Sequence, residues 1–222
     1  MAETAGAAGA GKAHAAGYPA SMRELIPGLW HWTTRHPNIG QDVSSYYVAS
    51  AATLLDPMVP PDGIVAFDGL PTPEHVVLSC RHHDRDHAQL VETFGASFHV
   101  NENGVHEYPG EEARPFAIGD EVVPGITAVA NGPIAPDDTV LRIDVDGGAL
   151  AFADSLINAG GEVGFVPDGL LGEDPEQVRG DITAAVRDLL DGQEFEHVLF
   201  AHGDPVVGGG REALARLVQN PS

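Results

Sequence analysis

The chain has a single cysteine and no long apolar run. Cys80 has no second cysteine to pair with, so no disulfide can form within the chain, and nothing in the sequence indicates an oxidising compartment. No stretch of about 18 apolar residues exists that could span a bilayer as a helix. From these absences we expect a cytoplasmic protein that does not cross a membrane.

Basic residues are scarce as well. Lys and Arg together number 11 against 33 Asp and Glu, which gives a formal net charge of −22. Nucleic acid and anionic lipid surfaces both attract positively charged proteins, so neither is an expected partner of this chain. The charge describes solubility and partner choice and says nothing about the fold.

The first 22 residues differ in composition from the rest of the chain. Met1 to Ala20 is rich in Ala and Gly, and it has neither the basic start nor the Leu/Val/Ile centre of a secretory signal. We therefore expect residues 1–22 to form a disordered leader. Residues 23–222 have the length of one domain, and we expect one domain there.

Apolar runs and turn residues divide this domain into strands followed by a mixture of strands and helices. Strands are expected within the hairpin 43–56 and at 63–67, 74–80, 97–100, 122–129, 139–145, 149–153 and 197–201. Helical spacing of apolar residues is found at 86–94, 175–190 and 211–218. The apolar runs at 74–80 and 197–201 are typical of strands that are buried on both faces.

Residues 81–87 read Arg-His-His-Asp-Arg-Asp-His and directly follow one of these buried strands. Three imidazoles and two carboxylates in seven positions have the composition of a site for Zn, Fe or Mn. A solvated polar turn is the simpler alternative, because such residues are mostly exposed. Two other expected strands end at Asp154 and His202, and strand ends on one edge of a sandwich can reach a common site.

This layout resembles the metallo-β-lactamase superfamily from about residue 24 to the end. Four segments carry the resemblance: Leu54-Leu55-Asp56, Val76-Val77-Leu78, Phe152-Ala153-Asp154-Ser155-Leu156 and Ala201-His202-Gly203-Asp204-Pro205. The resemblance implies an α+β fold, an αββα sandwich of two mixed β-sheets covered by helices. In such a fold the metal is held between the two sheets.

The main motif of the family, His-x-His-x-Asp-His, matches the chain imperfectly in two registers. In the first, Asp86 and His87 take the places of the final Asp-His, and the two earlier places fall on His82 and Asp84. In the second, the four places fall on Cys80, His82, Asp84 and Arg85. Arg85 cannot bind a cation, so we favour the first register because it keeps more ligands.

In the first register the resemblance implies metal ligands from three segments. Asp154 resembles the bridging carboxylate of the family and His202 its final ligand, so the full set is His82, Asp84, Asp86, His87, Asp154 and His202. Ile134 stands where the family has a ligating histidine, so we expect one metal rather than two, zinc first and iron or manganese as alternatives. His83 is a further ligand if the turn is distorted, and otherwise it faces solvent.

The chemistry that follows is hydrolysis of a small molecule. A bound metal lowers the pKa of its water toward ~7, and we expect Asp86 to orient or deprotonate that water as the catalytic residue. The resemblance allows ester, thioester, lactone, β-lactam and phosphodiester substrates and does not choose among them. Because Asp84 and Ile134 depart from the family pattern, the alternative is a catalytically degraded relative that serves as a binding or structural module.

Overall fold

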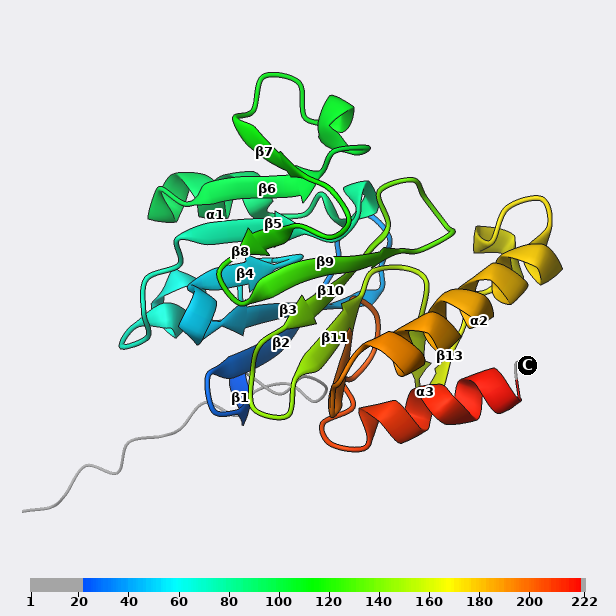
Figure 1. Ribbon diagram of the computed structural model, residues 1–222. Coiled ribbons are helices and arrows are strands. Elements are labelled where there is room, and N and C mark those ends of the chain that lie inside the picture. The colour runs from blue at the N-terminus through cyan, green and yellow to red at the C-terminus, as the bar shows by residue number, and fades with distance from the viewer. Residues whose placement is uncertain (1–21, 221–222) are drawn as a thin grey trace, which may run out of the picture.

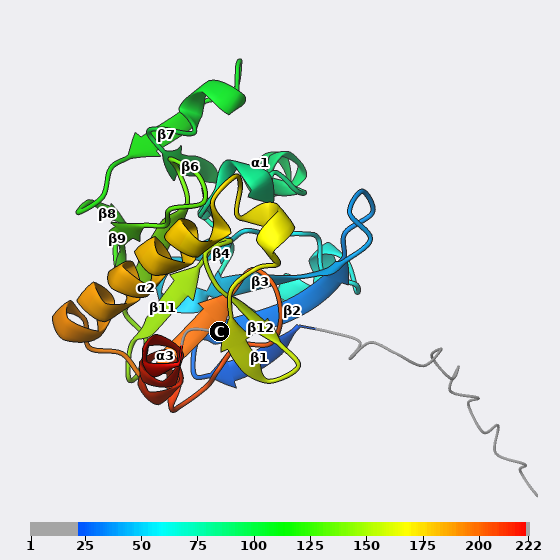
Figure 2. The same cartoon turned by 90° about the vertical axis from the view of Figure 1, so that its right-hand side faces the viewer.

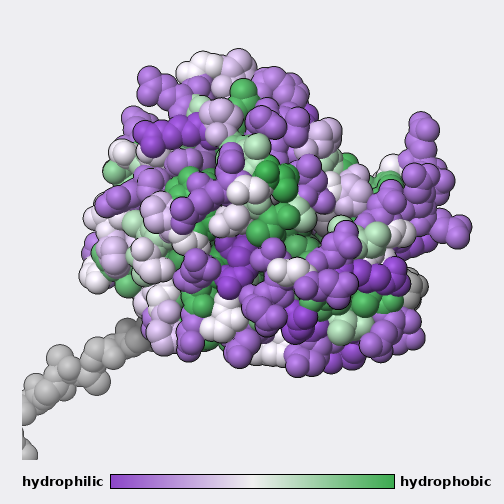
Figure 3. All heavy atoms as spheres, viewed as in Figure 1, coloured by the Kyte–Doolittle hydropathy of each residue, from purple (hydrophilic) through white to green (hydrophobic). Residues whose placement is uncertain are grey.

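A computed structural model describes residues 22–220 as two β-sheets packed face to face, with helices on the outside (Figure 1). The layers are those expected of an αββα sandwich. The predicted leader lies outside the described residues, except for Met22, which is buried. Hydrophilic residues dominate the face of the molecule shown in Figure 3. No helix among residues 22–220 is long and apolar enough to cross a membrane.

The first sheet is mixed and has its strands in chain order. They are β1 (Arg23–Ile26), β2 (Leu29–Arg35), β3 (Asp42–Val48), β4 (Thr53–Leu55), β5 (His75–Leu78), β6 (Ser97–Asn101) and β7 (Ala113–Phe116). The sheet is antiparallel as far as β4 and parallel from β4 to β7. Helix α1 (His87–Phe94) joins β5 to β6 and ends at Gly95, whose φ of 67° suits a residue without Cβ.

The second sheet has the strand order β14-β11-β10-β9-β8. Its strands are β8 (Glu121–Val123), β9 (Ile126–Asn131), β10 (Thr139–Ile143), β11 (Ala149–Phe152) and β14 (His197–Phe200). Helices α2 (Pro175–Gly192) and α3 (Gly210–Gln219) lie over its outer face (Figure 2). A small hairpin of β12 (Ile157–Ala159) and β13 (Glu162–Gly164) follows β11.

Short 3₁₀ helices occupy several connections between strands. They are η1 (Ala49–Ala51), η2 (Ile64–Phe67), η3 (Arg81–His83), η4 (Val105–Glu107) and η5 (Asp168–Leu170). The strand predicted at 63–67 was wrong: Gly63 has a φ of 76°, and its carbonyl accepts a hydrogen bond from Ala66, so the chain coils there. The strand predicted at 122–129 is two strands, because the chain turns at Gly125, where φ is 82°.

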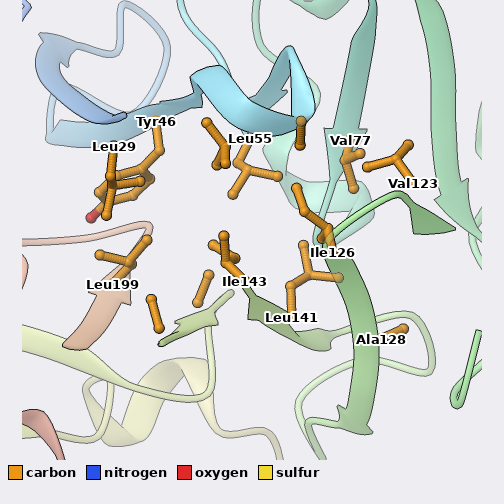
Figure 4. Packing of buried hydrophobic residues seen from close by; sticks show 14 of the residues in the cluster. Leu29, Tyr46, Leu55, Val77, Val123, Ile126, Ala128, Leu141, Ile143 and Leu199 are labelled. Atoms are coloured by element: carbon orange, nitrogen blue, oxygen red, sulfur yellow. The ribbon is translucent and has the colours of Figure 1, made fainter. Parts of the chain in front are cut away.

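The main core lies between the two sheets. Leu29, Leu55 and Val77 of the first sheet meet Leu141 and Leu199 of the second (Figure 4). A second cluster joins the other face of the second sheet to α2 and α3, and a third joins the first sheet to α1. Burial of apolar surface on each sheet therefore holds all the layers together.

One tyrosine ties the two sheets together at the edge where β14 lies. The hydroxyl of Tyr46, in β3, donates to the carbonyl of Phe200 at 2.8 Å and accepts from its N–H at 3.1 Å. Next to it, the N–H of Ser44 donates to the carbonyl of Ala201 at 2.9 Å. These bonds fix the end of β14, and with it the segment that carries His202, against β3.

Asp138 is a fully buried carboxyl in the turn before β10. Its Oδ2 accepts from the Ser155 hydroxyl at 2.6 Å, and no partner reaches its Oδ1 among residues 22–220. Burial raises the pKa of Asp138 to about 7 from an ordinary value of 3.8. Because the folded pKa lies above the unfolded one, the stability from this neutral group is complete at low pH and is lost as the pH rises to 7.

Asp138→Asn should therefore change how stability depends on pH. The amide is neutral at every pH, so the free energy of unfolding of the variant minus that of the unmodified protein should grow by about 2 kcal/mol from pH 5.5 to pH 8. Urea titrations at the two pH values measure this difference. Asp144→Asn, at a side chain 72% exposed, removes the same charge and should show no such growth. Equal pH profiles for the two variants would contradict a neutral Asp138.

Candidate metal centre

A sharp turn follows β5 and carries two histidines, His82 and His83. After Cys80 the chain forms η3, in which the N–H of His83 donates to the carbonyl of Cys80 at 3.0 Å. Arg81 anchors the turn from outside, since its backbone N–H and its Nε both donate to Asp137 at 2.6 Å. As a result His83 is buried, whereas the side chain of His82 is 55% exposed.

Three imidazoles gather around the carboxylate of Asp154, which follows β11. The Oδ1 atom lies 3.2 Å from Nε2 of His83 and 3.3 Å from Nε2 of His202. The Oδ2 atom lies 3.4 Å from Nδ1 of His82. The four residues come from the ends of β5, β11 and β14, so both sheets contribute to the cluster.

Asp56 sets the orientation of His83. Its Oδ2 lies 3.1 Å from Nδ1 of His83, and its carboxylate accepts from the N–H of Ser79 at 2.8 Å and from the Ser79 hydroxyl at 2.5 Å. Asp56 has a φ of 45°, a left-handed conformation that is costly for a residue other than Gly and is often found at functional sites. A carboxylate on one imidazole nitrogen, with the other nitrogen facing the site, is the usual support of a metal-binding histidine.

The charges of the cluster are strongly coupled. Burial opposes a charge on His83, but the carboxylates of Asp56 and Asp154 outweigh it and raise the pKa of His83 to about 9. Burial likewise acts against ionised Asp154, and yet the charge on His83 and the hydrogen bonds from the imidazoles hold its pKa well below the usual range. Arg85 adds a buried positive charge, and its Nη1 donates to the carbonyls of Ser44 and Asp56 at 2.8 Å each.

The donor atoms fit a divalent cation. In a tetrahedral zinc site with bonds of about 2.1 Å, adjacent ligand atoms lie about 3.4 Å apart, close to the separations around Asp154. Two overlapping groups share that carboxylate: His83, Asp154 and His202, and Cys80, His82 and Asp154. The Sγ of Cys80 lies 3.6 Å from Nδ1 of His82, and burial raises the pKa of this thiol, so without a cation Cys80 is neutral.

Of the six predicted ligands, the structure brings together His82, Asp154 and His202. It does not bring the other three to the cluster. His87 is buried in the first turn of α1, with Nδ1 3.0 Å from Asp84 and Nε2 2.9 Å from Glu111. Its ring stacks on Phe98, with centroids 4.5 Å apart.

The predicted catalytic residue, Asp86, also faces elsewhere. Its Oδ2 accepts from the backbone N–H of Val59 at 2.8 Å. The physical reason is that α1 begins at His87, so Asp86 and His87 belong to the start of a helix that packs on β5 and β6. The structure therefore corrects the first register, in which both residues were ligands.

The second register describes the turn better. Cys80 and His82 lie beside Asp154, and Arg85 lines the same cavity as His82 and Asp154. The sequence analysis placed Cys80 only in the register that it did not favour, and it made His83 a ligand only for a distorted turn. The 3₁₀ turn η3 is such a distortion. The sequence did contain a signal for the second register. The motif usually lies a short distance after the strand, and this distance favours a motif that starts at Cys80.

No family model matches this sequence, and neither does any curated protein. Solved structures do match it, among them rubredoxin oxygen:oxidoreductase from the anaerobe Desulfovibrio gigas, with 15% identity and a TM-score of 0.65. That match covers 90% of this chain but only 61% of the oxidoreductase chain, so this chain spans less than two thirds of that protein.

Two metallo-β-lactamases match along almost their whole length. DIM-1 metallo-β-lactamase has 14% identity and a TM-score of 0.66, over 93% of this chain and 100% of its own. The enzyme from Erythrobacter litoralis has 15% identity and a TM-score of 0.60, over 89% and 95% of the two chains. The predicted sandwich is thus confirmed, and the chain has the metallo-β-lactamase fold.

Proposed function

We propose that the protein is a metal-dependent hydrolase that binds one divalent cation through His83, Asp154 and His202. The observation that carries the proposal is the Asp56–His83 pair, which holds Nε2 of His83 3.2 Å from the carboxylate of Asp154. Imidazole and carboxylate ligands suit zinc first, with iron or manganese as alternatives. The similarity in fold to metallo-β-lactamases supports the proposal.

A bound cation of this kind supplies Lewis acidity, which polarises a substrate oxygen and lowers the pKa of water toward ~7. The protein's own residues provide the proton path. Oδ1 of Asp154 faces His83 and His202, whereas Oδ2 faces His82 and is the atom placed to orient a water. The side chain of His82 is 55% exposed, so a proton that its imidazole takes from this water can leave to solvent.

Metal content should distinguish His83 from His87. Zinc after dialysis, measured by mass spectrometry, should be near one equivalent in the unmodified protein and should be lost in Asp154→Ala and His202→Ala, because each removes a ligand. His83→Ala should behave in the same way. His87→Ala is the matched control, a buried histidine in the helix that follows the turn, and the variant should keep its zinc. Loss of zinc in His87→Ala, or full retention in His202→Ala, would contradict the proposed ligands.

His82→Ala tests the proton path separately from metal binding. We expect kcat for an ester to fall by about 10²-fold while zinc content stays unchanged, since His82 serves proton transfer and not the cation. His75→Ala is the control, because His75 contacts His99 and not Asp154. Zinc-loaded protein that turns over no ester, thioester, lactone or phosphodiester would instead support a binding or structural module.

A further inference from the structure

The cavity beside the Asp154 cluster has a polar end and an apolar end. Its volume is about 660 Å³, within the range of small-molecule sites. The polar end contains His82, His83, Asp154 and His202. A few polar residues of the 36–41 turn lie among aliphatic side chains from four separate segments, which form most of the apolar wall: Ile39, Val43, Ile134, Ile157, Val166 and Leu170.

Two of these aliphatic side chains are exposed. Ile39, in the turn between β2 and β3, is 54% exposed, and Leu170, at the end of η5, is 64% exposed. Single exposed aliphatic residues are normal on a protein surface. Here, however, two of them line one cavity together with the buried Val43 and Val166, so apolar surface continues from the interior to the mouth. That surface is suited to an apolar part of a ligand.

The charges at the cavity disfavour an anionic ligand. Among the described residues, Arg85 is the one Lys or Arg that lines the cavity; its Nη1 donates to the carbonyls of Ser44 and Asp56, and its Nη2 is buried without a partner. Asp84 and Asp154 line the same cavity, and the chain carries a net charge of −22. A phosphate site usually presents several cationic donors, whereas this wall sets one guanidinium beside two carboxylates.

We infer that the substrate is an uncharged ester or thioester of a medium-length aliphatic acid. Its carbonyl lies at the Asp154 cluster, and its acyl chain lies along the wall between Ile39 and Leu170. Water adds its oxygen to the acyl carbon, the bond from that carbon to oxygen or sulfur breaks, and the leaving alcohol or thiol takes a proton. The reaction rests on the proposed hydrolase function, whereas the preference for an alkyl chain rests on the cavity alone.

A series of p-nitrophenyl esters tests the inference on zinc-loaded protein. From acetate through butyrate and hexanoate to octanoate, kcat/KM should rise about threefold per methylene as the chain is buried. In the double variant Ile39→Ser, Leu170→Ser the rise of kcat/KM with each methylene should flatten. Val65→Ser is the matched control, because Val65 is 66% exposed but lies in η2 and does not line the cavity.

Binding of ketones separates this inference from the proposed reaction. Methyl hexyl ketone has the carbonyl and the chain but no leaving group, and calorimetry should show it binding at least about tenfold more tightly than methyl ethyl ketone. The double variant should lose that difference. If the preference holds but no ester turns over, the hydrolase proposal fails and the alkyl specificity stands. Equal affinities for the two ketones, or a chain-length preference untouched in the double variant, would overturn the inference.

Discussion

The packing of the two sheets' inner faces is the constraint on which the rest of the structure depends. Asp56 and His83 follow strands of the first sheet, whereas Asp154 and His202 follow strands of the second. These residues meet only because the apolar faces stack and Tyr46 bonds both backbone groups of Phe200 across the edge. The candidate metal centre is therefore a consequence of sheet packing, and no single segment of the chain contains it.

Much of the fold could be predicted from the sequence, because buried strands and amphipathic helices have clear apolar patterns. Asp154 and His202 lie together in the structure, and each could be picked out because it directly follows an apolar run. His87 lies away from them for a physical reason: residue spacing does not show that a 3₁₀ turn fits immediately after Cys80, nor that α1 starts at His87. The position of His83 depends on its contact with Asp56, which follows a different strand.

Arg85 helps to explain why one cation is expected rather than two. It stands at a motif position where the family has a histidine, and its guanidinium joins the turn to the backbone at Ser44 and Asp56. A permanent positive charge there opposes a second cation nearby. Ile134 lines the same cavity with an aliphatic side chain, so a residue that departs from the family's ligands contributes to the apolar part of the cavity wall.

The position of the cation tests the central claim most directly. Crystals grown with zinc and measured on both sides of the zinc absorption edge would give its location by anomalous scattering. The account predicts a single peak about 2.0–2.2 Å from Nε2 of His83, Nε2 of His202 and the carboxylate of Asp154. A peak between Asp84 and His87, or one bonded to Cys80 and His82 instead, would contradict it.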